Sequence, residues 1–351
     1  HPSSSLTGED ETFHFALATG RYKDNRIPPK GFRIGEAADR LSELLGKPVQ
    51  FVDDVIGTQA QNAAKALKPG KVLLLQNTRF VAGEKKNDPD TAKAFADMAD
   101  LYVNDAFGSA HRAHASTEGV AKYIPGVAGF LLQKEIRYLG QAIADPQRPF
   151  VAILGGAKIV DKIGVIRNLL TKADSILIGG GMANTFFSAQ GYPVGDSLVD
   201  DEALSTAKEI LGEAGTKIRL PVDVVIADRF EDDAQTQVVP VGPIPDGWRI
   251  LDIGPETVEN YGRVINDAQT VVWNGPMGVF EFPNFAKGTF GVAKAVASCP
   301  GTTIVGGGDS VAAINQSGLA DQITHISTGG GASLEMLEGT VLPGYAALQD
   351  K

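Results

Sequence analysis

The 351-residue sequence is poor in cysteine and has no long hydrophobic run. Cys299 is its single cysteine, so the chain cannot form an internal disulfide, and we expect a reducing, cytoplasmic setting. The longest apolar runs, such as 150–154 and 175–178, fall far short of the roughly 18 residues that a membrane-spanning helix needs. The polar residues 1–12 lack the basic segment and apolar core of a secretory signal. These shortages exclude a disulfide framework and predict no association with a membrane.

Positive charge is also scarce. Lysine and arginine number 32 against 42 aspartates and glutamates, which gives a net charge of −10. Residues 1–145 hold 18 basic and 18 acidic side chains, whereas residues 146–351 hold 14 and 24, so the acidic excess lies in the second part. This balance disfavours nucleic acid as a partner.

Two common nucleotide-binding patterns are missing as well. The sequence has no Gly-x4-Gly-Lys-Ser/Thr loop and no Gly-x-Gly-x-x-Gly loop. The second absence argues against a nicotinamide-dependent oxidoreductase, which the fold class alone would permit.

The chain does contain a regular alternation of strand and helix patterns. Short β-branched or Leu-rich runs predict buried parallel strands at Val49–Val52, Val72–Leu75, Leu101–Asn104, Phe150–Leu154, Ser175–Ile178, Val222–Ala227, Thr270–Trp273, Thr302–Val305 and Thr324–Ser327. Helical patterns lie between them, at Glu36–Leu45, Pro89–Ala99, Leu131–Ala144, Asp161–Leu170, Asp201–Leu211, Pro255–Ile265, Asn284–Ala297 and Asp309–Gln316. This alternation predicts an α/β protein with parallel sheets.

The length predicts two domains, since single domains usually hold about 100–200 residues. Two prolines within Asp145–Pro149 predict a stiff linker between a long helical pattern and a strongly apolar strand. We therefore expect domains over residues 1–145 and 146–339.

Glycine clusters follow four of the predicted strands. They are Gly155-Gly156, Gly179-Gly-Gly181, Gly306-Gly-Gly308 and Gly329-Gly-Gly331. Ligands of open α/β sheets bind at the carboxyl ends of the strands, so four such turns in one domain predict a phosphate-binding edge. A tight turn with an exposed lysine is the alternative for the first cluster, and a helix cap formed by Asp309 and Ser310 is the alternative for the third.

Other polar side chains also follow predicted strands. Asn274 and Glu281 lie in a dense turn and are candidates for hydrogen bonds to a nucleotide; an ordinary turn is the alternative. Arg79 and Arg112 each lie beyond a strand end, where a guanidinium can clasp phosphate or carboxylate, although a surface ion pair would also explain them. His111 and His114 lack the further ligands of a metal site.

Several of these segments together resemble phosphoglycerate kinases. The segments are Gly155-Gly-Ala-Lys158, Trp273-Asn-Gly-Pro-Met-Gly-Val-Phe-Glu281, Gly306-Gly-Gly-Asp-Ser310, Asn104-Asp-Ala-Phe-Gly with His111-Arg-Ala-His114, and Asn77-Thr-Arg-Phe80. The resemblance runs from about Ala37 to Lys351. It implies two doubly wound, Rossmann-like domains that face each other across a cleft and are joined by a hinge. The first would bind phosphoglycerate and the second the nucleotide, and a tail over residues 340–351 would pack back on the first.

The same resemblance implies an enzyme that moves a phosphoryl group between 1,3-bisphosphoglycerate and ADP, giving 3-phosphoglycerate and MgATP. It implies a monomer with Mg²⁺ as cofactor, held by Asp309. Lys158, Gly329 and Gly330 would act on the moving phosphoryl group, and Arg21, Arg79 and Arg112 would hold the phosphoglycerate. The nucleotide would be bound by Gly155, Gly156, Lys158, Lys162, Asn274, Glu281, Gly307, Gly308, Asp309 and Ser310.

The sequence also departs from the family pattern. An opening Asp-Phe-Asn-Val-Pro strand end and an arginine at the following helix start are missing, and the nearest match to the second strand end is Leu17-Ala-Thr-Gly-Arg21-Tyr22. Ile250 stands where the family usually has glycine, so its side chain is expected to crowd the adenine pocket. The abrupt change near Gly31 predicts a truncated or misread start. A sheet without its opening strand is expected to keep an open edge or gap.

These departures motivate an alternative: a catalytically impaired relative that binds nucleotide and serves as a scaffold or interaction protein. Turnover with phosphoglycerate and MgATP separates the two hypotheses.

Overall fold

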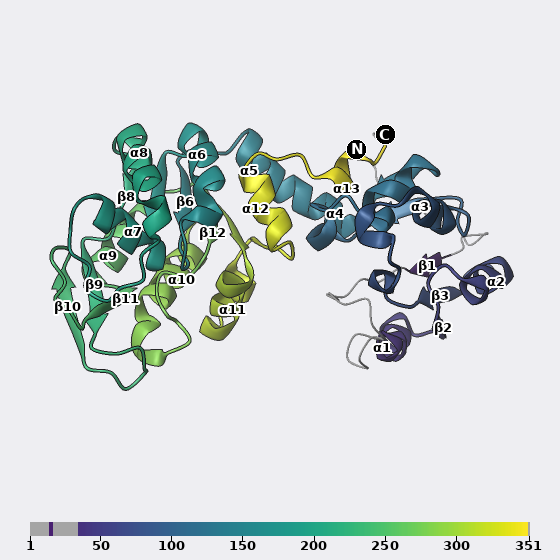
Figure 1. The fold of residues 1–351 in the computed structure, drawn as a ribbon, viewed down its shortest axis with the longest axis horizontal. Coiled ribbons are helices and arrows are strands. Elements are labelled where there is room, and N and C mark those ends of the chain that lie inside the picture. Colours follow the sequence, from purple (N-terminus) through teal and green to yellow (C-terminus); the bar gives the residue numbers. More distant parts are fainter. Residues whose placement is uncertain (1–13, 17–33, 350–351) are drawn as a thin grey trace. The chain divides into compact units, whose positions relative to one another are not determined.

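The computed structural model of the chain describes residues 14–16 and 34–349 (Figure 1). The chain divides into two compact units. Unit 1 runs to Leu132 and resumes from Leu342, and unit 2 spans Gln133–Val341. Residues 133–145, which we assigned to the first domain, group with unit 2 here, and the role of each unit remains a prediction.

Unit 2 is built on a six-stranded parallel sheet with the order β14-β13-β12-β6-β7-β8. Its strands are β6 (Phe150–Leu154), β7 (Ser175–Ile178), β8 (Ile218–Arg219), β12 (Thr270–Asn274), β13 (Thr302–Gly306) and β14 (His325–Ile326). The chain winds outward from β6 to β8 on one side and from β12 to β14 on the other. The winding therefore reverses between the neighbouring strands β6 and β12, and ligands of doubly wound sheets bind at such a point.

The sheet forms because its central strands are mainly apolar, with Ser175, Thr270 and Asn274 as the polar residues of β6, β7 and β12. All residues of β6, β7 and β12 are buried, as expected for parallel strands covered on both faces. Trp273 aligns with Ile153 on one side and Val305 on the other, and these three residues belong to the main core cluster. The α/β class with parallel sheets is confirmed.

Helices cover both faces of this sheet, as Figure 1 shows for α6 on one side and α10 and α11 on the other. Residues of α9, α10 and α11 join the main core cluster. The helices of unit 2 are α5 (Gln141–Ala144), α6 (Ile163–Lys172), α7 (Gly181–Ala189), α8 (Leu204–Ala214), α9 (Pro255–Asn266), α10 (Lys287–Ser298), α11 (Gly308–Ser317) and α12 (Gly331–Leu337). The expected helix over Leu131–Ala144 consists of α4 (Phe130–Glu135), a π-helical turn η7 (Ile136–Gly140) and α5.

A second sheet in unit 2 is antiparallel. It has the order β10-β9-β11, with β9 at Asp223–Ala227, β10 at Thr236–Pro240 and β11 at Arg249–Ile253. The prediction of a parallel strand over Val222–Ala227 is therefore wrong in its pairing, since β9 pairs antiparallel with both neighbours. Both neighbours escaped prediction because β10 is mostly exposed and β11 contains a register shift between Ile250 and Asp252.

The described strands of unit 1 form two small parallel sheets. One has the order β1-β3-β2, with β1 at His14–Ala16, β2 at Val49–Val52 and β3 at Val72–Leu75, and the other pairs β4 (Tyr102–Asn104) with β5 (Gly126–Ala128). We expected an open edge or gap in this domain, and the described strands do not join into one sheet.

The helices of unit 1 are short. Those in its described residues are α1 (Gly35–Leu45), α2 (Thr58–Ala66), α3 (Pro89–Ala96), the start of α4, and α13 (Pro343–Ala346), which lies in the C-terminal segment. Gly344 N–H donates to Ala110 O at 2.8 Å and Gln349 N–H to Gly126 O at 2.9 Å, so the C-terminal segment is bonded to unit 1. No helix in the described parts of the chain is both long and apolar enough to cross a membrane.

Candidate functional site

Two loops meet where the winding of the unit 2 sheet reverses. Gly155 N–H, just after β6, donates to Asn274 O at 3.0 Å, and Gly156 N–H donates to Pro276 O at 2.9 Å. A Cβ atom at Gly155 would lie 2.0 Å from Pro276 O, so this approach requires glycine. The glycine doublet therefore serves to bring the β6 and β12 loops together.

Lys162 lies beneath this junction. It is buried, and its Nζ donates to Gly155 O at 2.5 Å and lies 3.4 Å from Asn274 O. Burial lowers the pKa of Lys162 to about 8, while Asp309 and Asp161 act in the opposite direction. Lys162 is the last residue of the 3₁₀ turn η8 (Val160–Lys162) and directly precedes α6. It therefore lies outside the first turn of that helix.

Lys158 lies in the loop between Gly156 and η8 and is exposed. Lys158 therefore precedes the helical turns. An exposed cation at the carboxyl edge of a sheet is free to follow an anionic group.

The third glycine cluster leads directly from β13 into α11. Gly307 has φ +92° and precedes the helix, while Gly308 and Asp309 are exposed in its first turn. Ser310 is fully buried, and its Oγ accepts Gly275 N–H at 2.5 Å. Neither Asp309 nor Ser310 caps the helix with its side chain, so the capping alternative is not supported.

Asn274 is buried beside Gly307. A Cβ atom at Gly307 would lie 2.9 Å from Asn274 Nδ2, and this buried amide nitrogen has no hydrogen-bond partner in the described chain. Buried polar groups are nearly always paired, so this unused donor makes Asn274 a candidate for a ligand contact.

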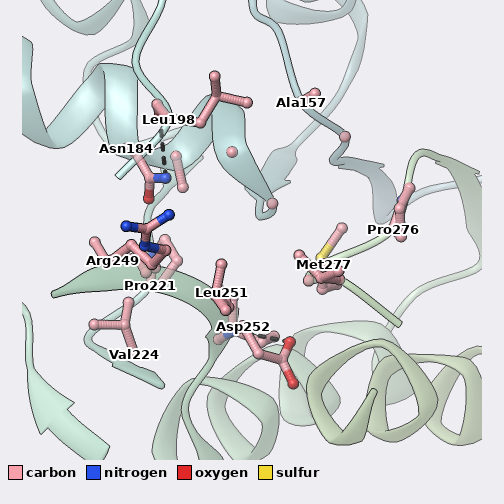
Figure 2. A pocket seen from close by; sticks show the side chains of 18 of the residues that line it. Ala157, Asn184, Leu198, Pro221, Val224, Arg249, Leu251, Asp252, Pro276 and Met277 are labelled. Atoms are coloured by element: carbon pink, nitrogen blue, oxygen red, sulfur yellow. Dashed lines mark hydrogen bonds between the residues drawn. The ribbon is translucent and has the colours of Figure 1, made fainter. Parts of the chain in front are cut away.

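A cavity of about 700 Å³ opens beside the junction (Figure 2). Figure 2 shows Ala157, Pro276 and Met277 across the cavity from Asn184 and Arg249. Its walls are mainly apolar, and the predicted residues Gly156, Glu281 and Asp309 line it. An apolar cavity with a few polar groups, next to the glycine-rich ends of the strands, has the composition of a site for a small organic ligand with polar groups.

Strand β11 supplies one wall of the cavity. We did not predict this strand from the sequence. Five consecutive residues of β11, Arg249 to Ile253, line the cavity, because the register shift at Leu251 interrupts the regular alternation of the strand. Arg249 Nη2 lies 3.4 Å from Asp196 Oδ2. Ile250, expected to crowd this region, is one of the lining residues.

The fourth glycine cluster is anchored from a distant part of the chain. Gly329 N–H donates to Ser327 Oγ at 3.2 Å, and Gly330 precedes α12 with φ +41°. Thr328 N–H donates to Glu135 Oε1 at 2.7 Å. Glu135 could not be predicted from the sequence, because an acid in a helical pattern gives no sign of a partner 193 positions away.

Unit 1 has a separate basic cluster. Arg79 lies in the turn η2 (Thr78–Phe80) after β3, half-buried, and Arg112 is exposed after β4. Burial lowers the pKa of His114 to about 4, and Arg79, Arg112, Lys85 and His111 lower it further. Burial also lowers the pKa of Arg79. The charge of Glu84 raises this pKa, and the charge of Arg112 lowers it further. The two predicted arginines thus lie within electrostatic reach of one another, as an anion site requires.

Arg21 lies outside the described residues. Within those residues no three His, Cys, Asp or Glu side chains gather as metal ligands. One exposed carboxylate at Asp309 beside the glycine-rich loops suits Mg²⁺, which keeps several waters and is bound by one or two carboxylates and by substrate phosphates.

Comparison with known families agrees with this geometry. The family model described as phosphoglycerate kinase matches residues 14–340. The match starts before Ala37, where we placed the beginning of the resemblance, and includes the segment with Arg21.

Named relatives give the same result. The chain is 59% identical over 323 residues to a phosphoglycerate kinase of Herpetosiphon aurantiacus, covering 91% of this chain and 82% of the relative. It is 59% identical over 341 residues to a phosphoglycerate kinase of Moorella thermoacetica, with 96% and 85% covered. The structure of phosphoglycerate kinase from Coxiella burnetii matches with a TM-score of 0.86 at 41% identity, covering 95% of this chain and 85% of that one.

Proposed function

Because the chain belongs to the phosphoglycerate kinase family, we propose the following roles for its residues in the family's reaction. The enzyme transfers a phosphoryl group reversibly between 1,3-bisphosphoglycerate and ADP, giving 3-phosphoglycerate and ATP. Such transfer depends on positioning and charge stabilisation rather than on covalent catalysis by the protein.

The nucleotide binds in unit 2, with its nucleoside in the cavity and its phosphates at the junction of the β6 and β12 loops. Lys162 and the backbone N–H groups of Gly307 and Gly308 contact phosphate, and Asn274 and Glu281 contact the nucleoside. The amide of Asn274, which has no partner among the described residues and lies beside Gly307, supports a ligand at this edge, and the apolar cavity wall supports the place of the nucleoside. Ser310 acts here by holding Gly275 N–H.

Mg²⁺ fits the exposed carboxylate of Asp309, which lies in the first turn of α11 beside the glycine-rich loops. The ion supplies charge neutralisation on the phosphates when bound. Asp309 orients it, and Lys162 adds a second positive charge on the protein side.

Lys158, Gly329 and Gly330 act on the transferred group. Lys158 follows the phosphoryl group with its exposed ammonium, and the two glycines offer backbone N–H groups to its oxygens. Gly329 N–H must leave Ser327 Oγ to do so.

Unit 1 holds the acceptor. Arg79 and Arg112 clasp the carboxylate and phosphate of 3-phosphoglycerate, with Arg21 as a third cation. The basic surroundings of His114 support an anion site here. We also propose that the protein is a cytoplasmic monomer with small-molecule substrates and without nucleic-acid or membrane partners.

The observation that carries the proposal is the junction of the Gly155-Gly156 and Asn274–Pro276 loops over buried Lys162. Steady-state turnover with 3-phosphoglycerate and MgATP tests it, with Lys158→Ala as the comparison. We expect turnover in the native chain and loss of turnover, with an unchanged circular dichroism spectrum, in the variant. A native chain that binds MgADP without turnover would instead favour the scaffold alternative.

A further inference from the structure

Glu84 is a buried carboxylate that joins two loops of unit 1. It has 0% exposure. Its Oε1 accepts Ser116 Oγ at 2.6 Å and its Oε2 accepts Ser116 N–H at 3.0 Å. A buried carboxylate is unfavourable unless its oxygens are satisfied, and one serine satisfies both of them here.

The first loop carries Arg79. Glu84 begins the turn η3 (Glu84–Lys86), which follows η2 in the chain. Val81 N–H donates to Thr78 O at 3.1 Å, and Glu84 N–H donates to Val81 O at 3.1 Å. Two consecutive turns therefore connect the Glu84 carboxylate to the backbone of Arg79 with little freedom.

The second loop carries Arg112. Ser116 lies in the π-helical turn η5 (Ala115–Gly119), and its neighbour Thr117 donates through Oγ1 to Arg112 O at 2.7 Å. His114 N–H donates back to Thr117 Oγ1 at 3.1 Å. The position of η5 therefore determines where the backbone of Arg112 lies.

We propose that Glu84 is a positioning residue for the acceptor: through Ser116 it sets the separation of Arg79 and Arg112. This inference rests on the proposed function, in which both arginines hold 3-phosphoglycerate. The two guanidiniums repel one another. The two hydrogen bonds between Glu84 and Ser116, called here the clip, hold the two loops together in spite of that repulsion.

A positioning role and a mere counter-charge predict opposite effects. Removal of a negative charge makes the cluster more positive, so a counter-charge alone predicts tighter binding of the anionic acceptor. Loss of the clip separates the arginines and weakens binding despite the added positive charge. The sign of the change in KM therefore identifies the role.

The test compares Glu84→Gln and Ser116→Ala with the native chain. Glu84→Gln removes the charge at nearly constant size, and Ser116→Ala removes only the Oγ contact. We expect KM for 3-phosphoglycerate to rise by about tenfold or more, as misplacement by a fraction of an ångström can produce, with KM for MgATP unchanged. The matched control Glu43→Gln, on the exposed face of α1, should change neither constant.

The outcomes separate the two levels of inference. Arg79→Met and Arg112→Met should both raise KM for 3-phosphoglycerate; if neither does, the proposed acceptor site is wrong. If they do and Glu84→Gln and Ser116→Ala leave this KM unchanged or lower it, only the positioning role is overturned. Should Glu84→Gln not fold, Ser116→Ala alone decides, because it keeps the Glu84 charge and the Ser116 N–H bond.

Discussion

Glu135 Oε2 lies 2.8 Å from His325 Nε2 inside unit 2, and the two side chains are 0% and 2% exposed. The other carboxylate oxygen accepts Thr328 N–H at 2.7 Å and Thr328 Oγ–H at 2.8 Å. One carboxylate therefore holds both ends of the segment that leads into Gly329 and Gly330.

Glu135→Ala should destabilise the protein by about 3–5 kcal/mol, because three polar groups lose their acceptor in the interior. Urea unfolding followed by circular dichroism measures this. The control Glu209→Ala removes an exposed ion pair with Arg167 and should change stability by less than about 1 kcal/mol. Equal effects of the two variants would contradict the role of Glu135.

The same carboxylate should contribute to acid sensitivity. Burial alone would raise the pKa of Glu135, but hydrogen bonds from His325 and Thr328 outweigh it and hold the pKa below its usual range. Its contribution to stability is thus complete above the unfolded pKa of about 4.3 and is lost as the pH falls through the lower folded value. The urea midpoint of unfolding should be measured from pH 6 down to pH 3, a range on the order of these pKa values. It should fall more steeply with decreasing pH for the native chain than for Glu135→Ala.

The sheet of unit 2 could be predicted because its strands are buried on both faces. Phe150–Leu154 and Ser175–Ile178 match β6 and β7 residue for residue, since an uninterrupted apolar run leaves little ambiguity. Strand β10 could not be predicted in this way, because three of its first four residues are exposed and its sequence, Thr-Gln-Val-Val-Pro, is neither a continuous apolar run nor a regular alternation.

The candidate site could be predicted only where it follows strand ends. The loops with Gly155 and Asn274 were found because glycine and turn residues after a buried strand indicate the ligand edge of a sheet. Glu84 and Glu135 were not found, since each looks like a solvated acid until a partner from a distant segment is placed against it. The partner of Glu84 is 32 positions away.

Lys162 should add to the stability of the nucleotide-free protein as the pH rises above about 8. Its pKa, lowered to about 8 by burial, is below the unfolded value of about 10.4. Between these values the unfolded chain binds more protons, so this group makes stability rise with pH over that window.

In the same window a neutral Lys162 no longer pairs with phosphate. KM for MgATP should therefore rise as the pH passes about 8. Lys162→Met should start from a higher KM and lack this step. Parallel pH profiles of KM for the two proteins would contradict the role of Lys162.

Ile250 should limit the space for the nucleobase. Its side chain lines the cavity on β11, while its backbone N–H donates to Ser197 Oγ at 2.9 Å and stays bonded in Ile250→Ala. The variant should lower KM for MgATP several-fold and leave KM for 3-phosphoglycerate unchanged. Val238→Ala, on the exposed strand β10, is the control. A higher KM for MgATP in Ile250→Ala would mean that Ile250 packs usefully against the base.

Ser310→Ala separates support of the loop from direct contact with phosphate. The fully buried Ser310 Oγ accepts Gly275 N–H at 2.5 Å, so its removal leaves a buried donor unpaired and should lower stability by about 1–3 kcal/mol. KM for MgATP should rise as the Asn274–Pro276 loop loosens. Ser317→Ala, at the other end of α11, removes a hydroxyl whose bond within the described residues is to Ile314 O of its own helix, and it should leave that KM unchanged. A higher KM at full stability in Ser310→Ala would instead indicate that the hydroxyl turns to the phosphate itself.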